Sequence, residues 1–488
     1  MRKTESICPI CLKKVEAKIC KKNGYLVIEK RCEEHGKFSI PHWQSSKIFD
    51  FVEKYDYFKS YEKIRGENFS NVNCPFACGL CNDHLSKTVI GVIDLTKRCD
   101  LSCVMCFASF SDKETSYEPS KDEIFKMLDF MSRLNPKPPA VLFSGGEPLL
   151  REDLPEIIAF AHKMGFLTIL ATNGIRIAKF PEIIANLKKS GLNVVYLQFD
   201  SLNDEFYEKF RGGKLLKYKL KVIELCRKYD VEIILVPTLI AGANNHEIGD
   251  LIRFAAENSD IVRGLVFQPI AYTGRATDMP EAGATVDTMF AEEVEAQTLG
   301  EIRATDLYPI PIMVPPIIVM RKFMKKPWPL FSCSPHCGIV NWIYVSKNGR
   351  LIPINRLLNF EKFFEELNAL SKSINSKGKI QILFHLFLAA LKSLNLGLVH
   401  REIGIINFLK TVLRVHVSPT YRSLGELRRR ILLLGCMAFM DRYNFDVARV
   451  RRCVIHFITP DLKVIPFCAY NNIYRTEIEE RYAKKARN

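Results

Sequence analysis

The residues with the clearest chemical potential in this sequence are three cysteines within eight positions, in the stretch DLTKRCDLSCVMCFASF. Cys99, Cys103 and Cys106 directly follow an apolar segment, VIDLT, that is typical of a buried strand. A cubane [4Fe–4S] cluster normally takes four thiolates. Three thiolates on one loop would hold three irons and leave the fourth open to a substrate or a cofactor. The spacing therefore predicts a catalytic cluster.

Two shorter motifs in residues 1–45 have the spacing of a single-ion site. Cys8 and Cys11 form CPIC, Cys32 and His35 lie in CEEHG, and a strand-like segment, GYLVIEKR, separates the two motifs. Three sulfur ligands and one imidazole suit a tetrahedral zinc or iron ion. We therefore predict a rubredoxin-like or zinc-ribbon-like mononuclear metal module, with four free side chains as the alternative.

Further cysteines predict two auxiliary iron–sulfur sites. Residues 46–87 end in CPFACGLCNDH, which repeats the C-x3-C-x2-C spacing with Cys74, Cys78 and Cys81 and offers His84 as a fourth ligand. A four-thiolate site would also form in the C-terminal part if two distant segments pair. Those segments carry Cys333, Cys337, Cys453 and Cys468. Cys436 is an alternative ligand in an apolar setting, and Cys20 and Cys226 are expected to be packing residues.

From about residue 88 to 300, apolar strand-like segments alternate with amphipathic helical ones, for example AVLFS before LPEIIAFAHKMG. Such alternation predicts a parallel sheet or barrel with its active-site residues on loops at the carboxyl ends of the strands. The residues at those ends are Gly145, Gly146 and Glu147, then Thr172 and Asn173, then Asp200 and Ser201. A surface carboxylate at Glu147 and a plain Asn-Gly turn at Asn173 are the structural alternatives.

Residues 301–488 differ from the rest in composition. They contain 30 Lys and Arg against 13 Asp and Glu, whereas the first 300 residues contain 40 and 41. We expect the prolines between 309 and 316 to exclude a regular helix, and residues 360–435 to be mostly helical, apolar and basic. The cations predict an anionic partner, nucleic acid or lipid headgroups, with a solvated basic surface as the alternative. Candidate phosphate contacts are Arg428, Arg429, Arg430, Arg449, Arg451 and Arg452.

The sequence also indicates a cellular compartment. The first residues, MRKTESICPICLKK, lack the apolar region of a signal peptide, and the longest apolar run, IQILFHLFLAAL, is too short to span a bilayer. We therefore expect a cytoplasmic protein. Because that compartment keeps thiols reduced, we expect no disulfides among the sixteen cysteines, and the spacing of most of them indicates metal ligands instead.

The combination of C-x3-C-x2-C after the first strand and GGEP after the second resembles the radical S-adenosylmethionine (SAM) superfamily. The resemblance implies an α/β fold: a partial (β/α)6 TIM-type barrel over residues 88–300, between the N-terminal metal module and a C-terminal auxiliary-cluster and helical region. It implies that SAM binds the open iron and is cleaved to a 5′-deoxyadenosyl radical, which abstracts a substrate hydrogen. The backbone around Gly145, Gly146 and Glu147 would receive the methionine amino group.

The same resemblance assigns the remaining cofactor-site residues. Contacts with the ribose or the substrate would come from Thr172, Asn173, Asp200 and Ser201. Phe107 follows the last cysteine, and Met105 stands where the superfamily usually has an aromatic residue. This departure predicts a variation in how the protein packs against the cofactor.

Over nearly its full length the sequence resembles one subgroup, the archaeal tetraether lipid synthases and related pterin-modifying methylases. The resemblance includes CPIC…CEEHG, CPFACGLCNDH, SGGEP, FQPIAYTGR and the tail RCVIHFITPD…IPFCAYN. It implies one mononuclear iron or zinc ion, one radical-generating cluster and two auxiliary clusters.

From this resemblance we expect an enzyme that couples the terminal methyl carbons of two archaeal isoprenoid diether chains into tetraether lipids. Breaking unactivated C–H bonds requires radical chemistry, which this cofactor supplies. The expected partners are archaeal membrane phospholipids as substrates, an electron donor such as a ferredoxin, and the inner face of the membrane as a peripheral contact. A nucleic-acid partner is not expected, because no RNA-binding module is recognisable.

Three alternatives stay open. A radical enzyme of the same type would act on a pterin, a peptide or RNA, or would make a different lipid cross-link. A cobalamin-dependent methylase is disfavoured because no cobalamin-type domain precedes the barrel. A non-catalytic iron–sulfur or zinc scaffold belongs to another class, and the open three-cysteine loop together with GGEP counts against it.

Overall fold

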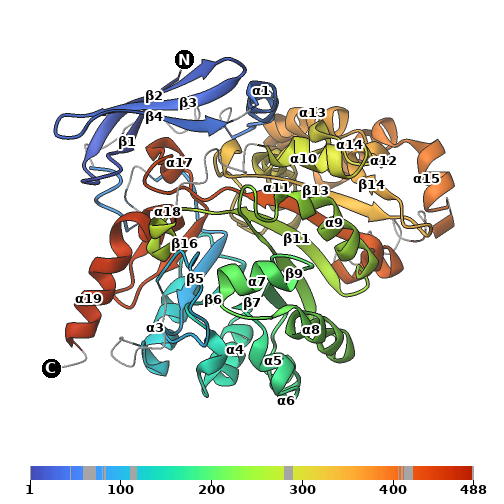
Figure 1. Cartoon of the computed structure of the whole chain (residues 1–488). Helices are drawn as coiled ribbons and strands as arrows, with labels where there is room; N and C mark the ends of the chain where they lie inside the picture. Colours follow the sequence, from blue (N-terminus) through green and yellow to red (C-terminus); the bar gives the residue numbers. More distant parts are fainter. Residues whose placement is uncertain are drawn as a thin grey trace.

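The centre of the structure is a set of six parallel strands that follow one another in chain order (Figure 1). They are β5 (Ile90–Asp94), β6 (Ala140–Ser144), β7 (Leu167–Thr172), β8 (Val194–Gln198), β9 (Glu232–Val236) and β11 (Val262–Pro269). Their near-continuous apolar side chains form the main core. The predicted α/β class and the partial (β/α)6 barrel are confirmed. This computed structural model describes residues 2–43, 45–58, 73–79, 81, 84–109, 118–279, 289–404, 406–407, 410 and 421–485.

Helices between the strands cover the outside of the barrel. They are α3 (Lys121–Ser132), α4 (Leu154–Lys163), α5 (Ile175–Lys179), α6 (Glu182–Lys189), α7 (Asp204–Arg211), α8 (Leu216–Tyr229) and α9 (Ile248–Glu257). Helix α3 begins at a capping box, in which Ser120 accepts from the N–H of Glu123 and the Glu123 carboxylate accepts from the N–H of Ser120. Its apolar residues at helical spacing, Ile124, Met127, Leu128 and Met131, are buried against the sheet.

Strands from the C-terminal part extend the barrel sheet at both edges. Strand β15 (Ile431–Met437) pairs in parallel with β11, and β16 (Ile455–Ile458) pairs in parallel with β5. Outside these strands lie β13 (Gly338–Val345) with β12 (Tyr308–Pro309) and β14 (Leu351–Pro353), and β17 (Val464–Pro466). With β10 (Thr238–Leu239), the sheet has thirteen strands. The hairpin of β16 and β17 confirms the hairpin-like reading of the tail.

Two expectations about the C-terminal part are wrong. Helix α11 (Val314–Met324) forms within the proline-rich stretch, because Pro315 and Pro316 occupy its first turn, where no intrahelical N–H donor is needed. Residues 431–435, which we expected to be helical, belong to β15. Their apolar side chains suit a strand that is paired on both sides, and composition alone did not separate the two.

Three helices confirm the helical character of the described residues between 360 and 404. They are α13 (Phe360–Ser373), α14 (Lys379–Ser393) and α15 (Leu396–Glu402). Residues 405, 408, 409 and 411–420 of the expected insert lie outside the described residues, as do 59–72 of the predicted segment 46–87. Further helices are α10 (Phe290–Gln297), α17 (Val447–Arg451), α18 (Phe467–Ala469) and α19 (Arg475–Lys485). Among the helices described, we find none with both the length and the apolar character of a membrane span.

The N-terminal residues form an antiparallel four-stranded sheet that lies against the C-terminal part (Figure 1). Its strands are β1 (Arg2–Ile7), β2 (Lys14–Lys22), β3 (Tyr25–Cys32) and β4 (Gly36–Trp43), and α1 (Ser46–Lys54) follows. Arg2 and Thr4 donate to the buried carboxylate of Asp446 at 2.6 and 2.5 Å. The buried ammonium of Lys30 donates to the carbonyl of Tyr443 at 2.8 Å. These contacts fix the sheet over the segment before α17.

A buried ion pair joins the segment after α1 to the C-terminal part, and we expect its loss to destabilise the protein. Arg452 donates to both carboxylate oxygens of Asp56 at 2.7 Å, and also to the carbonyl of Cys333 at 2.8 Å. The substitution Asp56→Asn would leave a buried guanidinium charge uncompensated. The free energy of unfolding should fall by about 3 to 5 kcal/mol in anaerobic denaturant titrations.

The matched control for this prediction is Asp260→Asn. Arg227 and Asp260 form a similar two-pronged pair, at 2.6 and 3.1 Å, on the exposed surface. Its loss should cost at most about 1 kcal/mol, because water solvates both groups. Equal effects of the two substitutions would contradict the role assigned to the buried pair.

Candidate active site and metal-binding sites

The cysteine loop after β5 and the GGEP loop after β6 are joined by backbone hydrogen bonds. The N–H of Gly146 donates to the carbonyl of Thr96, and the N–H of Glu147 donates to the carbonyl of Arg98, both at 2.8 Å. A Cβ atom at Gly145 would lie 2.3 Å from the Thr96 oxygen, and one at Gly146 would lie 2.1 Å from the Arg98 oxygen. Both positions therefore require glycine, and the GGE segment lies directly beside the first cysteine of the loop.

The carboxylate of Glu147 is fully buried, which rules out the surface interpretation. It accepts hydrogen bonds from the Thr172 hydroxyl at 2.8 Å and from the N–H groups of Asn173 and Leu149 at 2.8 and 3.1 Å. Burial raises the pKa of Glu147 to about 7, although these donors oppose the shift. The Asn173 side chain donates in turn to Asp100 at 2.6 Å. Glu147 thus holds the loop after β7 against the cysteine loop.

Asp200 and Ser201 lie at the carboxyl end of β8, where the sequence places them, but their polar atoms are engaged within the protein. Asp200 accepts from the guanidinium of Arg211 at 2.9 and 3.1 Å and from the N–H of Thr238 at 2.9 Å. The Ser201 hydroxyl donates to Glu247 at 2.8 Å. Contact of either residue with a ribose or substrate stays a prediction, and the observed role of Asp200 is to position Arg211.

Two buried cations beneath the site were missed by the sequence analysis. The guanidinium of Arg211 lies beside the cysteine loop. Burial opposes its charged form, but Asp200 and the Cys103 thiol raise its pKa. Burial lowers the pKa of Lys219 to about 8, and its ammonium donates to the carbonyl of Asn173. The available signal was a lysine on the apolar face of the amphipathic helix α8.

The loop after β11 supports the end of the cysteine loop. The N–H of Arg275 donates to the carbonyl of Cys106 at 2.9 Å. The hydroxyl of Thr273 donates to the carbonyl of Phe107, also at 2.9 Å. A Cβ atom at Gly274 would lie 2.5 Å from the Phe107 carbonyl carbon, so only glycine allows this approach. The segment FQPIAYTGR is therefore a structural support for the cluster loop.

Met105 and Phe107 have different surroundings. Met105 is buried in a small apolar cluster with Phe206 and Phe210, which explains how a non-aromatic residue is accommodated at that position. The Phe107 ring is partly exposed, and its centroid lies 6.1 Å from that of Phe467 on α18. Contact between Phe107 and a cofactor stays a prediction.

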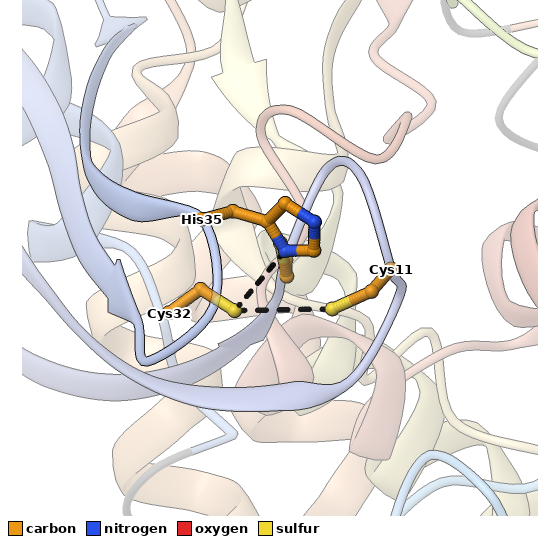
Figure 2. Close-up of side chains that lie close together, drawn as sticks. Cys11, Cys32 and His35 are labelled. Atoms are coloured by element: carbon orange, nitrogen blue, oxygen red, sulfur yellow. Dashed lines mark hydrogen bonds between the residues drawn. The ribbon is translucent and has the colours of Figure 1, made fainter.

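The predicted mononuclear ligands converge at one end of the N-terminal sheet. Figure 2 shows Cys11, Cys32 and His35 of this group. Ligand atoms of Cys8, Cys11, Cys32 and His35 all lie within 4.8 Å of one another. The Cys32 sulfur is 3.8 Å from that of Cys11 and 3.5 Å from the His35 Nδ1 atom, and that nitrogen is 3.7 Å from the Cys8 sulfur. The hydrogen bond with His35 lowers the pKa of the Cys32 thiol. This arrangement suits one tetrahedral ion.

Cys74, Cys78 and Cys81 are brought together beside α17 and line one small pocket with His84. Burial and the neighbouring thiols raise the pKa of Cys78 to about 12. The Nε2 atom of His84 lies 2.9 Å from the carbonyl oxygen of Cys453 and so links this set to the next one. Whether His84 also serves as the fourth ligand stays a prediction.

The two C-terminal cysteine segments lie close together, since Cys333 and Cys337 pack against Val454 and Ile455 beside Cys453. A shared four-thiolate site stays a prediction. Burial, then the neighbouring Cys337 thiol, raises the pKa of Cys333, and Cys337 also contributes to the raised pKa values of Cys453 and Cys468. A buried guanidinium lies beside these thiols, because Arg449 has its pKa raised by Cys337 and Cys468 against the effect of burial. The four thiols with an adjacent cation fit an anionic iron–sulfur cluster.

The other cysteines and the candidate phosphate contacts lie elsewhere. Cys226 and Cys436 are buried in the main core, and Cys20 lies in β2 outside the metal ligands. Most of the arginines are engaged within the protein, and their contact with a phosphate stays a prediction. Three of them form ion pairs: Arg428 with Glu232, Arg451 with Glu5 and Arg452 with Asp56. Two others donate to backbone carbonyls, Arg430 to Val345 and Arg449 to Ala438.

The donor set at the carboxyl edge of the sheet fits a cluster with one open iron. Three thiols lie on one loop, and the adjacent GGE backbone approaches as closely as glycine permits. The N–H groups of Gly146 and Glu147 are used within the protein, so a ligand amino group would meet carbonyl oxygens there. This chemistry matches the methionine end of SAM.

We expect Cys32→Ala to remove the ion of the N-terminal site. The variant should bind one fewer zinc or iron ion per chain in elemental analysis, and its thermal unfolding midpoint should fall, because a closed tetrahedral site stabilises the sheet that supplies its ligands. Cys20→Ala, in the same sheet but outside the ligand set, should leave the metal content unchanged. A full metal complement in the Cys32 variant would refute the assignment.

The raised pKa of Glu147 predicts a pH-dependent stability difference. Because the folded state favours the neutral carboxyl, stability is lost as pH rises from the usual carboxyl range towards the folded pKa of about 7. Glu147→Gln removes this titration. Relative to that variant, the native protein should lose about 3 kcal/mol of unfolding free energy between pH 4.5 and 7.

The control for this titration is Glu152→Gln on the exposed loop that follows. Its difference from the native protein should stay constant over the same pH range in denaturant titrations. A flat difference for the Glu147 variant as well would show that the buried carboxyl does not titrate there.

Comparison with known proteins gives a family and several relatives. Residues 93–255 match the model of the radical SAM superfamily, and residues 1–44 match the HMPTM N-terminal zinc ribbon domain. A 7,8-dihydro-6-hydroxymethylpterin dimethyltransferase from Methanocaldococcus jannaschii is 40% identical, covering 99% of this chain and 96% of the relative. A GTP 3′,8-cyclase from Listeria monocytogenes is 34% identical over 41% of this chain and 59% of the relative.

Among solved structures, Streptococcus suis SuiB bound to S-adenosylmethionine is 15% identical, with a TM-score of 0.34. The match covers 52% of this chain and 62% of that one.

These findings contradict the expectation that the chain couples lipid chains. The relative that matches over nearly the whole length is named a pterin dimethyltransferase, and the comparison with it favours the pterin alternative. The tetraether lipid synthase subgroup and the lipid substrate are therefore corrected. The sequence motifs identified the radical chemistry, but they did not identify the substrate.

The cofactors follow from the family models and from the site. The radical SAM match implies SAM and a [4Fe–4S] cluster, and the zinc ribbon match agrees with a further metal site at Cys8, Cys11, Cys32 and His35. The chain is a radical SAM enzyme. It belongs to the radical SAM superfamily, in the family that includes the pterin dimethyltransferase of Methanocaldococcus jannaschii.

Proposed function

We propose that this enzyme methylates a reduced pterin of the 7,8-dihydro-6-hydroxymethylpterin type. The observation that carries the proposal is the 40% identity to a dimethyltransferase of that name over 99% of this chain. Such coverage includes the barrel, the N-terminal metal module and the C-terminal cysteine segments together. A relative that shares only the barrel would support the radical chemistry and leave the substrate undefined.

In this proposal Cys99, Cys103 and Cys106 hold the cluster. When bound, the cluster and SAM would supply a 5′-deoxyadenosyl radical, which removes a hydrogen atom that acid–base chemistry cannot remove. That cleavage leaves the methyl group on methionine, so each transferred methyl would come from a second SAM molecule, which leaves as S-adenosylhomocysteine, and the electrons would come from the donor protein. The GGE backbone accepts from the methionine amino group. Glu147 holds Thr172 and Asn173 at the next strand end, beside the site where ribose or substrate would lie.

Buried cations keep this cysteine loop in place and balance its charge. Arg211, held by Asp200, lies beside Cys103, where its positive charge would offset the negative charge of the thiolates that bind the cluster. The buried ammonium of Lys219 donates a hydrogen bond to the carbonyl of Asn173 and so positions the loop after β7. Neither residue contacts the reacting atoms in this proposal, so both are positioning residues.

The remaining cysteine sets are proposed to hold auxiliary clusters, one at Cys74, Cys78 and Cys81 and one at the four C-terminal cysteines. Their supply of electrons would come from a small donor protein of the ferredoxin type. His84 lies between the two sets, since it lines the pocket of the first and contacts the carbonyl of Cys453 in the second. The arrangement would give two neighbouring redox centres.

The proposal is tested with anaerobically reconstituted protein, a chemical reductant, methyl-labelled SAM and 7,8-dihydro-6-hydroxymethylpterin. We expect 5′-deoxyadenosine and a pterin that gains the mass of labelled methyl groups. Cys103→Ala should reduce both products to background, whereas Cys226→Ala, in the core of α8, should keep them. The ratio of the two products reports the coupling of SAM cleavage to transfer.

Two results would overturn parts of the proposal. Deoxyadenosine with an unchanged pterin would reject the pterin substrate and keep the radical enzyme. Absence of deoxyadenosine from protein with intact cluster absorbance would reject the assignment of the catalytic cluster to Cys99, Cys103 and Cys106.

A further inference from the structure

Helix α14 exposes a stripe of large apolar side chains. Ile380, Phe384, Phe387 and Leu391 are 83, 58, 63 and 49% exposed. Their spacing of four, three and four residues places them on one face of the helix. Ile382 and Ala389 are buried, so the helix packs on the protein through a different face. α14 is therefore apolar on two sides, and only one of them is covered by the described chain.

Such a stripe is unusual on a folded domain. Single exposed apolar residues are common, but a contiguous row along a helix marks an interaction surface. Leu396, at the start of α15, is also 51% exposed. The sequence of α14, KIQILFHLFLAALKS, contains two lysines and no Asp or Glu. Nothing acidic on this helix would therefore oppose a negatively charged partner.

A basic groove opens beside the first turn of α14. It has a volume of about 1070 Å³ and lies between α11, the C-terminal end of α13 and the segments around Lys87 and Ser332. Its cationic lining residues are Lys87, Arg321, Lys322, Lys325, Lys326 and Lys372, and no described Asp or Glu lines it. Exposed lysines at this density attract a surface that carries many negative charges.

The groove and the stripe are parts of one helical unit. Ile374 and Asn375, in the connection between α13 and α14, line the groove, and the ammonium of Lys379 at the start of α14 lies 5.9 Å from the Phe323 ring centroid on α11. The described carboxylates of α13 lie in the first half of the helix, whereas its last turns line the groove. They are Glu361, Glu365 and Glu366, and Glu366 pairs with Lys392. The positive end of the unit is thus the end where α14 begins.

We propose that this unit, the exposed stripe of α14 with the basic groove at its first turn, docks the protein on an anionic lipid bilayer. Helix α14 would lie in the plane of the interface, with its stripe at the boundary of headgroups and acyl chains and the lysines at the phosphates. The proposal concerns location and holds whatever the substrate is. The bilayer is a docking surface here and not a reactant.

The residue types favour a bilayer over a protein partner. Five of the six groove cations are lysines, which are depleted in protein–protein interfaces and frequent in segments that contact anionic lipid. Four side chains along one helix also cover too little area for the core of a stable protein interface. A narrow apolar row flanked by lysines is the pattern of an interfacial helix.

The test is co-sedimentation of the full-length, metal-loaded protein with vesicles. One set is phosphatidylcholine alone, and the other is phosphatidylcholine mixed with phosphatidylglycerol. We expect clear preference for the mixed vesicles, weakened by salt. Phe384→Gln with Phe387→Gln should lower the partition coefficient about tenfold for each ring removed. Lys322→Glu, Lys325→Glu and Lys326→Glu together should abolish the preference for phosphatidylglycerol.

Matched controls lie on other faces. Phe180→Gln with Leu299→Gln removes two exposed apolar side chains, and Lys163→Glu, Lys189→Glu and Lys228→Glu reverse three exposed lysines on α4, α6 and α8. Both control variants should bind vesicles like the native protein. Unchanged thermal unfolding midpoints and cluster absorbance show that all variants are folded.

Several outcomes would overturn the proposal. The proposal is wrong if the native protein does not sediment with mixed vesicles. It is also wrong if the α14 double variant binds these vesicles as well as the native protein does. Sedimentation velocity without lipid measures the oligomeric state, and so tests whether the stripe binds another copy of this chain instead. A dimer that the α14 substitutions dissociate, combined with absent vesicle binding, would assign the stripe to self-association instead.

Discussion

Burying a thiol disfavours its ionised form, and this constraint governs much of the structure. Burial raises the pKa of Cys78 and Cys99 to about 12 and that of Cys468 to about 11, yet only thiolates bind metal. The protein compensates with buried guanidinium groups. Arg211 lies beside Cys103, and Arg449 beside Cys337 and Cys468. In the proposed sites, metal binding would complete the compensation.

The parallel sheet and its site loops could be predicted from sequence because the signals are local. Apolar runs ending in glycine or polar residues place Cys99, Gly145 and Asn173 at strand ends without any knowledge of the fold. The cysteine spacings likewise predicted the N-terminal ligand set, whose four ligand atoms converge in the structure. The sequence could not show whether the segments of Cys333 and Cys453 lie side by side. Their proximity depends on where the fold places β16 and the loop before β13.

What the sequence did not reveal depends on tertiary contacts. Pro315 and Pro316 are compatible with a helix only because α11 begins one residue earlier, and the apolar residues of β15 become a strand because β11 and β13 flank them. The engagement of Asp200 by Arg211 joins α7 to the end of β8. Substrate choice depends on such contacts too, which is why motifs that identified the radical chemistry gave the wrong substrate.

The pairing of β16 with β5 has a consequence for synthesis on the ribosome. Some 360 residues separate the two strands in the chain, and β15 likewise reaches β11 only after a long excursion. At translation rates of about 5 to 20 residues per second, both edges of the nascent six-stranded sheet stay unpaired for on the order of tens of seconds. Open edges template pairing with other chains. Nascent barrels on neighbouring ribosomes are therefore at risk of joining edge to edge, and the C-terminal strands end that risk when they emerge.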